Sequence, residues 1–295
     1  VDTANLTGIS VVKADDSTEI MYYEDGYEGC YTSEYNWFAV IAGDDRLALD
    51  ADAVTALAET ANYVSFEGCA AYNVTEEKEL EKYGLGSGAT HITVTFNEES
   101  ENSDGNTLYT QNTFDIYVGL EMDDEYTYVR SEGSSIIAYV ETSSLSELLS
   151  IDIYSIQPSD ICLLEYSTVD SMSIEYNGQT HVYSISRQTM NVGSGDDSSS
   201  YQITATYYKD GEEITLSEFT DIFATITGLY SDGIGEKPDN NPEIIITFNR
   251  NTSSFTTMIL NLYKYNDSFY LADFAGRTDQ LVSKRSIDTL ISYVE

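Results

Sequence analysis

The stretch HITVTFN at residues 91–97 returns late in the chain as EIIITFN at residues 243–249. In both stretches apolar residues hold every second position, Ile92, Val94 and Phe96 in the first and Ile244, Ile246 and Phe248 in the second, and both stretches end on Thr-Phe-Asn. Because the side chains of a β-strand point alternately to the two faces of its sheet, this alternation predicts two half-buried strands. The shared ending suggests that the chain was built twice from one plan.

Two further pairs of segments support such a duplication. Residues 140–150, VETSSLSELLS, match residues 282–292, VSKRSIDTLIS, without a gap. An apolar stripe with helical spacing begins at Val54 in the first half and at Phe219 in the second half. Apolar residues that recur three and four positions apart form one face of a helix. We therefore predict an internal duplication in which each copy contains strands, a helix, more strands and a second helix.

This order of elements predicts the α+β fold class, with two similar halves. Each half is expected to hold mostly antiparallel strands with two helices packed on the sheet. The predicted domains are a first repeat at 1–152, a linker at 153–165 and a second repeat at 166–295. The linker contains Pro158, which favours extended backbone in the residue before it. Whether the halves share one sheet stays open at this stage.

Local motifs predict where some elements begin and turn. Ser144 and Glu147 have the spacing of a helix capping box, and so do Thr215 and Glu218. The dipeptide Asn-Gly at 177–178 predicts a two-residue hairpin turn between two strands.

The chain of 295 residues carries a strong negative charge, with 51 acidic and 13 basic residues and a net charge of −38. Nucleic-acid binding requires lysine and arginine side chains that neutralise phosphates, so a nucleic-acid partner is excluded. Docking on anionic lipid through a basic surface is excluded for the same reason. No apolar run approaches the length of about 18 residues that suggests a spanning helix. The composition is typical of an extracytoplasmic or cell-surface domain, with any membrane anchor expected outside this sequence.

The three cysteines, Cys30, Cys69 and Cys162, do not have the spacing of a metal site. Cys30 and Cys69 lie in the same half, so they can form a disulfide or remain free thiols. A disulfide scaffold is not needed for a chain of this size.

Few residues suggest catalysis or cofactor binding. The two histidines, His91 and His181, lack the further ligands of a zinc site, and we expect them to be exposed at strand ends. The paired carboxylates, such as those at 123–125, fall in turns where water keeps both ionised. The acidic loop 231–241 does not match an EF-hand. Trp37 is expected in the core rather than in a platform that stacks on sugars. The sequence thus predicts no catalytic, cofactor-binding or metal-binding residue.

The phrase LEKYGL at 80–85, with Tyr83, Gly84 and Leu85 as its signature, combines with ITVTFN and with the helix phrase SSLSELL to suggest a family. The chain resembles a bacterial extracytoplasmic family of domains of unknown function. That family often accompanies ABC-type transport systems, including auxiliary components of gliding motility. The resemblance covers nearly the whole chain, and it brings no catalytic residues. The chain departs from the family in one place, because Gly86-Ser87-Gly88 follows the signature where the family usually has acidic residues and proline.

The resemblance implies a non-enzymatic, lipoprotein-like accessory or interaction domain in the cell envelope. Its partner is expected to be an envelope protein such as a transporter component, and no cofactor is implied. The alternative is a surface module that binds a glycan or calcium through tyrosine-rich strands or acidic loops. A hydrolase is a third hypothesis, and it requires a deep cleft that holds two facing acids.

Overall fold

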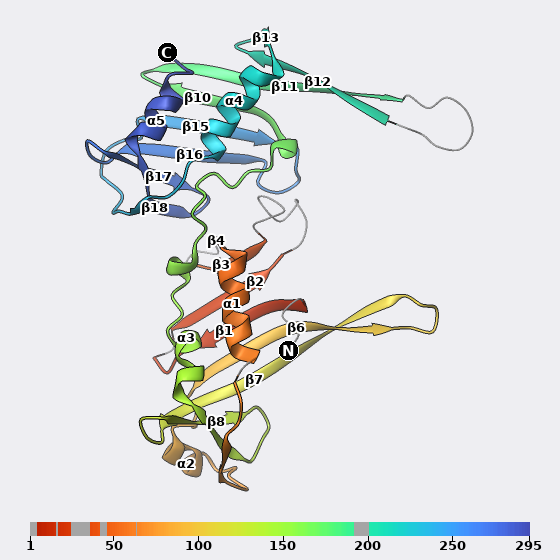
Figure 1. The fold of residues 1–295 in the computed structure, drawn as a ribbon, viewed down its shortest axis with the longest axis vertical. Helices are drawn as coiled ribbons and strands as arrows, with labels where there is room; N and C mark the ends of the chain where they lie inside the picture. The colour runs from red at the N-terminus through yellow and green to blue at the C-terminus, as the bar shows by residue number, and fades with distance from the viewer. Residues whose placement is uncertain (1–4, 16, 25–35, 42–45, 63, 192–200) are drawn as a thin grey trace. The chain divides into compact units, whose positions relative to one another are not determined.

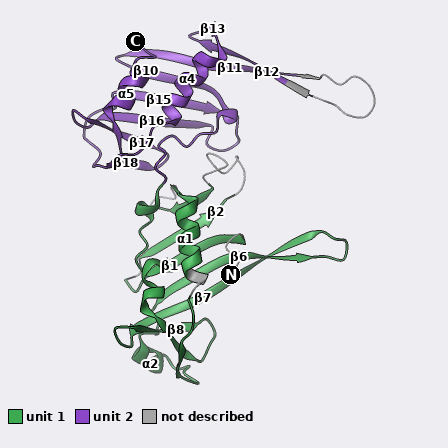
Figure 2. Ribbon diagram, viewed as in Figure 1, with its two compact units in different colours: residues 1–24, 34–157 green, residues 25–33, 158–295 purple. Residues whose placement is uncertain are grey.

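The computed structural model describes residues 5–15, 17–24, 36–41, 46–62, 64–191 and 201–295. These residues form two compact units (Figure 2), the first holding the described residues up to Gln157 and the second those from Pro158 onward. Each unit contains its own nine-stranded antiparallel sheet, shown in Figure 1.

In the first unit, the strand order across the sheet is β4-β3-β2-β1-β6-β7-β8-β9-β5. Strands β6 and β7 are much longer than their neighbours and project beyond them as a two-stranded ribbon (Figure 1). The strands of this unit are β1 (Leu6–Val12), β2 (Thr18–Tyr23), β3 (Trp37–Val40), β4 (Arg46–Leu49), β5 (Gly68–Ala71), β6 (Thr90–Glu101), β7 (Thr107–Glu121), β8 (Tyr126–Ser131) and β9 (Ile137–Glu141).

The main core of the first unit lies between this sheet and two helices, α1 (Ala51–Asn62) and α3 (Ser146–Leu149). Val54 and Ala58 of α1 are four residues apart, so both point at the sheet and are buried. The Asp50 side chain accepts a hydrogen bond from the Ala53 backbone N–H at 2.9 Å, which satisfies one free donor at the start of α1. Helix α2 (Glu77–Leu80) packs with a separate, smaller cluster that contains Leu85 and Ile137.

In the second unit, the strand order across the sheet is β13-β12-β11-β10-β15-β16-β17-β18-β14. Helix α4 (Leu216–Thr227) buries Phe219 and Ile226, and helix α5 (Lys284–Ile291) buries Ile287 and Leu290. The strands are β10 (Val169–Tyr176), β11 (Gln179–Asn191), β12 (Tyr201–Lys209), β13 (Glu212–Ile214), β14 (Gly233–Ile234), β15 (Ile244–Arg250), β16 (Thr257–Lys264), β17 (Phe269–Phe274) and β18 (Arg277–Ser283).

The two sheets have the same strand topology. In each unit the first four strands form one side of the sheet, the last four strands form the other side, and the short fifth strand lies at the far edge. The two echoed stretches lie in corresponding central strands, β6 and β15, and each pairs with the first strand of its unit. In the first unit Thr95 pairs with Gly8, and in the second Thr247 pairs with Ser173. Residues of the two units can therefore be compared position by position.

The predicted α+β class with two helices per half is wrong. Strands account for 48% and helices for 20% of the described structure, so the fold is mostly β. The expected helix at the end of the first half is only the four-residue α3, and several short strands were not anticipated, such as β13 and β14. Short strands have weak patterns of their own, because the hydrogen bonds that stabilise them come from neighbouring strands.

The local motifs gave mixed results. At α4 the capping box is present, because the Glu218 N–H donates to Thr215 Oγ1 while the Thr215 N–H donates to Glu218 Oε2. The capping box predicted at Ser144 is wrong, since Ser144 instead lies in a short 3-10 helix and donates to the carbonyl of Glu141. The Asn-Gly turn at 177–178 joins β10 to β11, and both of its residues have positive φ, 50° and 73°.

Candidate functional site

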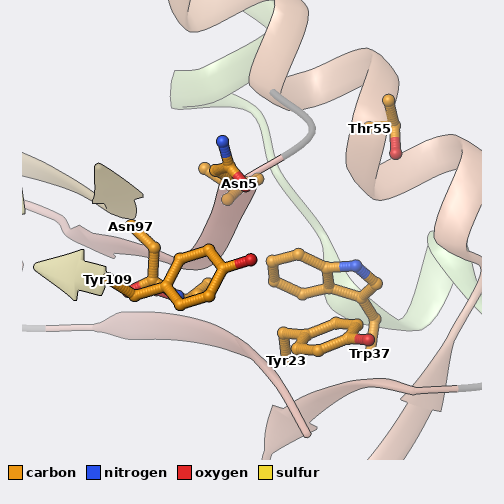
Figure 3. Close-up of a pocket in the computed structure, with 8 residues that line it drawn as sticks. Asn5, Tyr23, Trp37, Thr55, Asn97 and Tyr109 are labelled. Atoms are coloured by element: carbon orange, nitrogen blue, oxygen red, sulfur yellow. The ribbon is translucent and has the colours of Figure 1, made fainter. Parts of the chain in front are cut away.

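The candidate site is a pocket of about 560 Å³ in the first unit, at the point where β1 begins and the ribbon of β6 and β7 leaves the sheet (Figure 3). Its volume falls in the range of ordinary small-molecule sites. Five strands (β1, β2, β3, β6 and β7) and helix α1 contribute to it, so its walls come from segments that are far apart in the chain. The lining residues are Asn5, Leu6, Thr7, Tyr23, Trp37, Thr55, Asn97 and Tyr109.

Three aromatic side chains shape the pocket. The rings of Tyr23 and Trp37, paired across β2 and β3, meet edge to face with their centroids 5.8 Å apart. In Figure 3 the Tyr109 side chain points from the ribbon toward the indole of Trp37. Trp37 is only 6% exposed and belongs to the main core, whereas Tyr23 is 37% and Tyr109 62% exposed. A ligand would therefore meet mainly the two tyrosine rings, with Trp37 as the rigid floor.

The polar groups of the pocket are uncharged. Two amides, Asn5 and Asn97, flank the aromatic rings (Figure 3). The Thr7 hydroxyl oxygen is buried and has no hydrogen-bond partner among the described residues. The Thr55 hydroxyl donates to the carbonyl of Ala51 at 2.8 Å, which leaves its oxygen able to accept. No lysine, arginine, aspartate or glutamate lines this pocket among the described residues.

A second hollow, of about 630 Å³, lies next to the first along β6 and shares Asn5 and Asn97 with it. Two carboxylates, Glu98 and Glu99, line this second hollow together with Asn112. The uncharged pocket is thus followed, along the same strand, by an acidic surface.

The corresponding region of the second unit is built differently. Tyr183 occupies the position of Tyr23, but its neighbour across the strand pair is Lys209, where the first unit has Trp37. The Lys209 ammonium lies 5.4 Å from the centre of the Tyr183 ring and donates to the carbonyl of Tyr293. Asn249, which corresponds to Asn97, is engaged by a hydrogen bond from its amide to Ser171 Oγ at 3.1 Å.

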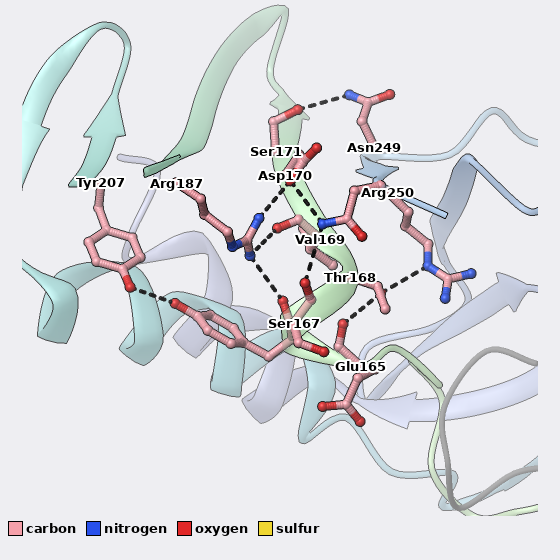
Figure 4. A network of polar contacts seen from close by, with 12 residues as sticks. Glu165, Ser167, Thr168, Val169, Asp170, Ser171, Arg187, Tyr207, Asn249 and Arg250 are labelled. Atoms are coloured by element: carbon pink, nitrogen blue, oxygen red, sulfur yellow. Dashed lines mark hydrogen bonds and ion pairs between the residues drawn. The ribbon is translucent and has the colours of Figure 1, made fainter. Parts of the chain in front are cut away.

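Arg187 centres a polar network that occupies this part of the second unit (Figure 4). Its guanidinium donates to Asp170 Oδ1 at 2.6 Å and to the Val169 carbonyl at 2.8 Å. Beside it, the Tyr166 hydroxyl donates to the Tyr207 hydroxyl at 3.1 Å, and burial raises the pKa of Tyr166. The side chains of the second unit therefore bind one another here, whereas those of the first unit surround an open pocket.

The signature residues Tyr83, Gly84 and Leu85 lie outside the pocket, in the small cluster beside α2. Gly84 has a left-handed conformation with φ of 69°, and its N–H donates to the Glu81 carbonyl. Leu85 is buried. A Cβ at Gly119 would lie 2.1 Å from the Tyr83 carbonyl oxygen, so the turn packs directly on the backbone of β7. This arrangement describes a structural turn.

The histidines are not simply exposed at strand ends, as the sequence suggested, because each is paired with an aspartate. His91 Nε2 lies 3.1 Å from Asp115 Oδ1, and His181 Nδ1 lies 2.8 Å from Asp210 Oδ2. Hydrogen bonds from the His181 ring and the Val182 N–H hold the pKa of Asp210 below its usual range.

The structure also places the carboxylates at 123–125 and the cysteines that the sequence singled out. Asp123 accepts hydrogen bonds from the backbone N–H groups of Glu125 and Tyr126, as in an ordinary turn. Within the described ranges, no group of three or more His, Cys, Asp or Glu residues could hold a metal ion. Cys69 is an exposed free thiol and Cys162 a buried one, and Cys30 lies outside the described residues.

Among the described residues, no helix has the length and apolar character that a membrane crossing would need.

Reasoning from sequence did not find Asn5, Thr7, Asn97 or Tyr109. Two of these residues, Asn97 and Tyr109, reach the pocket only because β6 and β7 continue beyond β1. The one available signal was the length of the polar, strand-like sequence on both sides of the turn at 102–106. Trp37 lies in the core as expected, but it also lines the pocket.

Comparison with known proteins gives one match. The family model for a domain of unknown function, DUF4340, matches residues 37–244. No curated protein matches the chain, and no solved structure does either.

Proposed function

We propose that the chain, which belongs to the DUF4340 family of domains of unknown function, is a non-enzymatic recognition domain. In this proposal the pocket of the first unit binds a carbohydrate. The observation that carries the proposal is the combination of exposed aromatic rings with uncharged amide and hydroxyl groups around one pocket.

A sugar ring has the complementary chemistry. One face of a pyranose presents C–H groups, which can lie against the apolar faces of Tyr23 and Tyr109. Its hydroxyl groups donate and accept hydrogen bonds, and the amides of Asn5 and Asn97 do both. A hydroxyl that reached the Thr7 oxygen would supply the partner that this buried atom lacks in the described structure. The uncharged lining favours a neutral sugar over a phosphorylated or acidic one.

We further propose that the domain works outside the cytoplasm as an accessory part of an envelope complex. The resemblance of LEKYGL and its companion segments to transport-associated domains supports this role. The net charge of −38 suits an exposed domain that stays soluble and does not bind nucleic acid. The expected partner is an envelope protein, with a component of an ABC-type transport system as the first choice.

The carbohydrate proposal can be tested through Trp37, the single tryptophan of the chain. The protein is titrated with a panel of neutral oligosaccharides while tryptophan fluorescence and binding heat are recorded. We expect a saturable change with at least one sugar. Tyr109→Ala and Thr7→Val should each weaken binding at least fivefold, while Tyr72→Ala, an exposed tyrosine outside the pocket, should leave it unchanged.

Two results would overturn parts of the proposal. If no neutral sugar binds, or if the pocket variants bind as well as the control, the pocket is not a carbohydrate site. If the bound oligosaccharide is cleaved during incubation, the domain is an enzyme. The envelope role is tested separately, by purifying the full-length protein from its source membrane, and recovery without any transport component would count against it.

A further inference from the structure

In the ribbon of the first unit, the outer backbone edges extend beyond the described strands that pair with β6 and β7. We define the β6–β7 ribbon as residues 97–101 and 107–111 with the turn between them. The pairing of β1 with β6 ends at Phe96, and the pairing of β8 with β7 begins at Ile116. Within the described residues, the strands of the ribbon pair only with each other, from Asn97 with Gln111 to Glu101 with Thr107.

Such a ribbon is unusual in water. A two-stranded hairpin without a covered face is marginally stable alone, and free strand edges invite another strand to pair with them. The ribbon also exposes apolar surface near its tip, where Leu108 is 49% exposed and Tyr109 62% exposed. These features match the recognition mode in which an extended peptide adds a strand to an open edge.

Charge indicates which peptide would fit. The β6–β7 ribbon carries four carboxylates, Glu98, Glu99, Glu101 and Asp104, and the sequence has no lysine or arginine between Lys82 and Arg130. Side chains alternate along a strand, and residues paired across a ladder share a face. Glu99, Glu101 and Tyr109 therefore lie on one face of the ribbon, since Tyr109 pairs with Glu99.

We propose that the β6–β7 ribbon is a docking surface for an extended, cationic segment of a partner protein, which adds to the edge of β7 in continuation of β8. The backbone of the segment pairs with residues 107–111. Its lysine or arginine side chains meet Glu99 and Glu101, and one of them lies over the Tyr109 ring, as cations do on aromatic faces. This proposal does not depend on carbohydrate binding.

The test uses the full chain and a synthetic octapeptide that alternates lysine with threonine, with binding followed by calorimetry at low salt. The first comparison peptide has methyl groups on alternate backbone nitrogens of one edge, which removes hydrogen-bond donors and keeps the charge. The second has glutamate in place of lysine. We expect the unmodified lysine–threonine octapeptide to bind. The methylated peptide should bind at least tenfold more weakly, and the peptide with glutamate should not bind.

Two variants locate the binding site. Glu99→Gln combined with Glu101→Gln should weaken binding at least tenfold. The matched change Glu98→Gln, on the opposite face of the ribbon, should change it less than twofold. Equal binding of the methylated and unmethylated peptides would reduce the interaction to general charge attraction and overturn strand addition. Self-association of the chain without peptide, abolished by changes in the ribbon, would assign the edge to a second copy and also overturn the proposal.

Discussion

Trp37 of the first unit and Lys209 of the second unit hold corresponding positions in the two sheets, each paired across the strands with a tyrosine. The scaffold position is the same, but the environments differ. Trp37 is buried in the main core and lines the pocket, whereas Lys209 extends over Tyr183 and donates to a backbone carbonyl. One plan of strands thus carries an open aromatic pocket in one unit and a network of polar contacts in the other.

This difference predicts unequal costs of truncation at the two positions. Trp37→Ala should lower the free energy of unfolding by about 3 to 5 kcal/mol, because it removes a large buried ring and leaves a cavity. Lys209→Ala should cost about 1 kcal/mol, since it removes one hydrogen bond near the surface. Urea denaturation followed by circular dichroism measures both values. Equal costs would mean that Trp37 is not part of the packed core.

The capping box of α4 gives a second prediction. Thr215→Ala removes the side chain that accepts the Glu218 N–H, so the free energy of unfolding should fall by about 1 kcal/mol. Thr220→Ala is the control within the same helix. Its hydroxyl bonds only to carbonyls of the preceding turn, and alanine favours the helix, so stability should change by less than about 0.5 kcal/mol. A Thr215→Ala protein as stable as the control would contradict the reciprocal cap.

A third prediction concerns Gly119, on which the Tyr83 turn packs. Gly119→Ala would place a methyl group 2.1 Å from the Tyr83 carbonyl oxygen, and backbone cannot yield as a side chain tip can. We expect a loss of roughly 2 to 3 kcal/mol in the free energy of unfolding, as for overpacked sites. Gly88→Ala is the matched control, because a Cβ there meets nothing within 4 Å. Thermal denaturation of both variants measures the difference in stability. Equal melting temperatures would show that the turn does not pack directly against β7.

The fourth prediction is a pH dependence at Asp115. Burial acts to raise the pKa of Asp115, but hydrogen bonds from Thr93 and Thr113 and the charge of His91 outweigh it, so this pKa lies below its ordinary value of 3.8. A carboxyl group whose pKa is lower in the folded state stabilises the fold at pH values above its unfolded-state pKa. As the pH falls through 3.8 toward the folded-state pKa, the unfolded chain takes up its proton first, and the stabilisation is lost.

Asp115→Asn should therefore be less stable than the wild type at pH 7, and the difference should shrink as the pH falls below 3.8. Denaturation at a series of pH values measures this difference. Asp104→Asn, at the exposed tip of the β6–β7 ribbon, serves as the control and should show no comparable trend. A stability difference at Asp115 that stays constant from pH 7 to pH 3 would contradict the assigned contacts.

Some elements were readable from sequence because their own residues determine them. The stripe beginning at Phe219 is helix α4, with the predicted capping box at its start. The stretches 91–97 and 243–249 lie in or overlap strands β6 and β15. Long periodic segments and side-chain caps carry their signal locally, since the groups that interact lie within four residues of one another. The fold class was not readable in this way, because short strands such as β14, which pairs with β18, depend on distant partners.

The order of residues alone thus decided which segments alternate, which form helical stripes, and that the surface is strongly acidic. It also decided that Trp37 is buried, since an apolar run surrounds it. Only the folded chain brought Asn5, Tyr23 and Tyr109 to Trp37 and left the β7 edge of the ribbon without a paired strand among the described residues. Those arrangements depend on where one strand stops relative to its neighbour. The register between strands is set by contacts between residues that are far apart in the chain. Local sequence patterns do not predict those contacts.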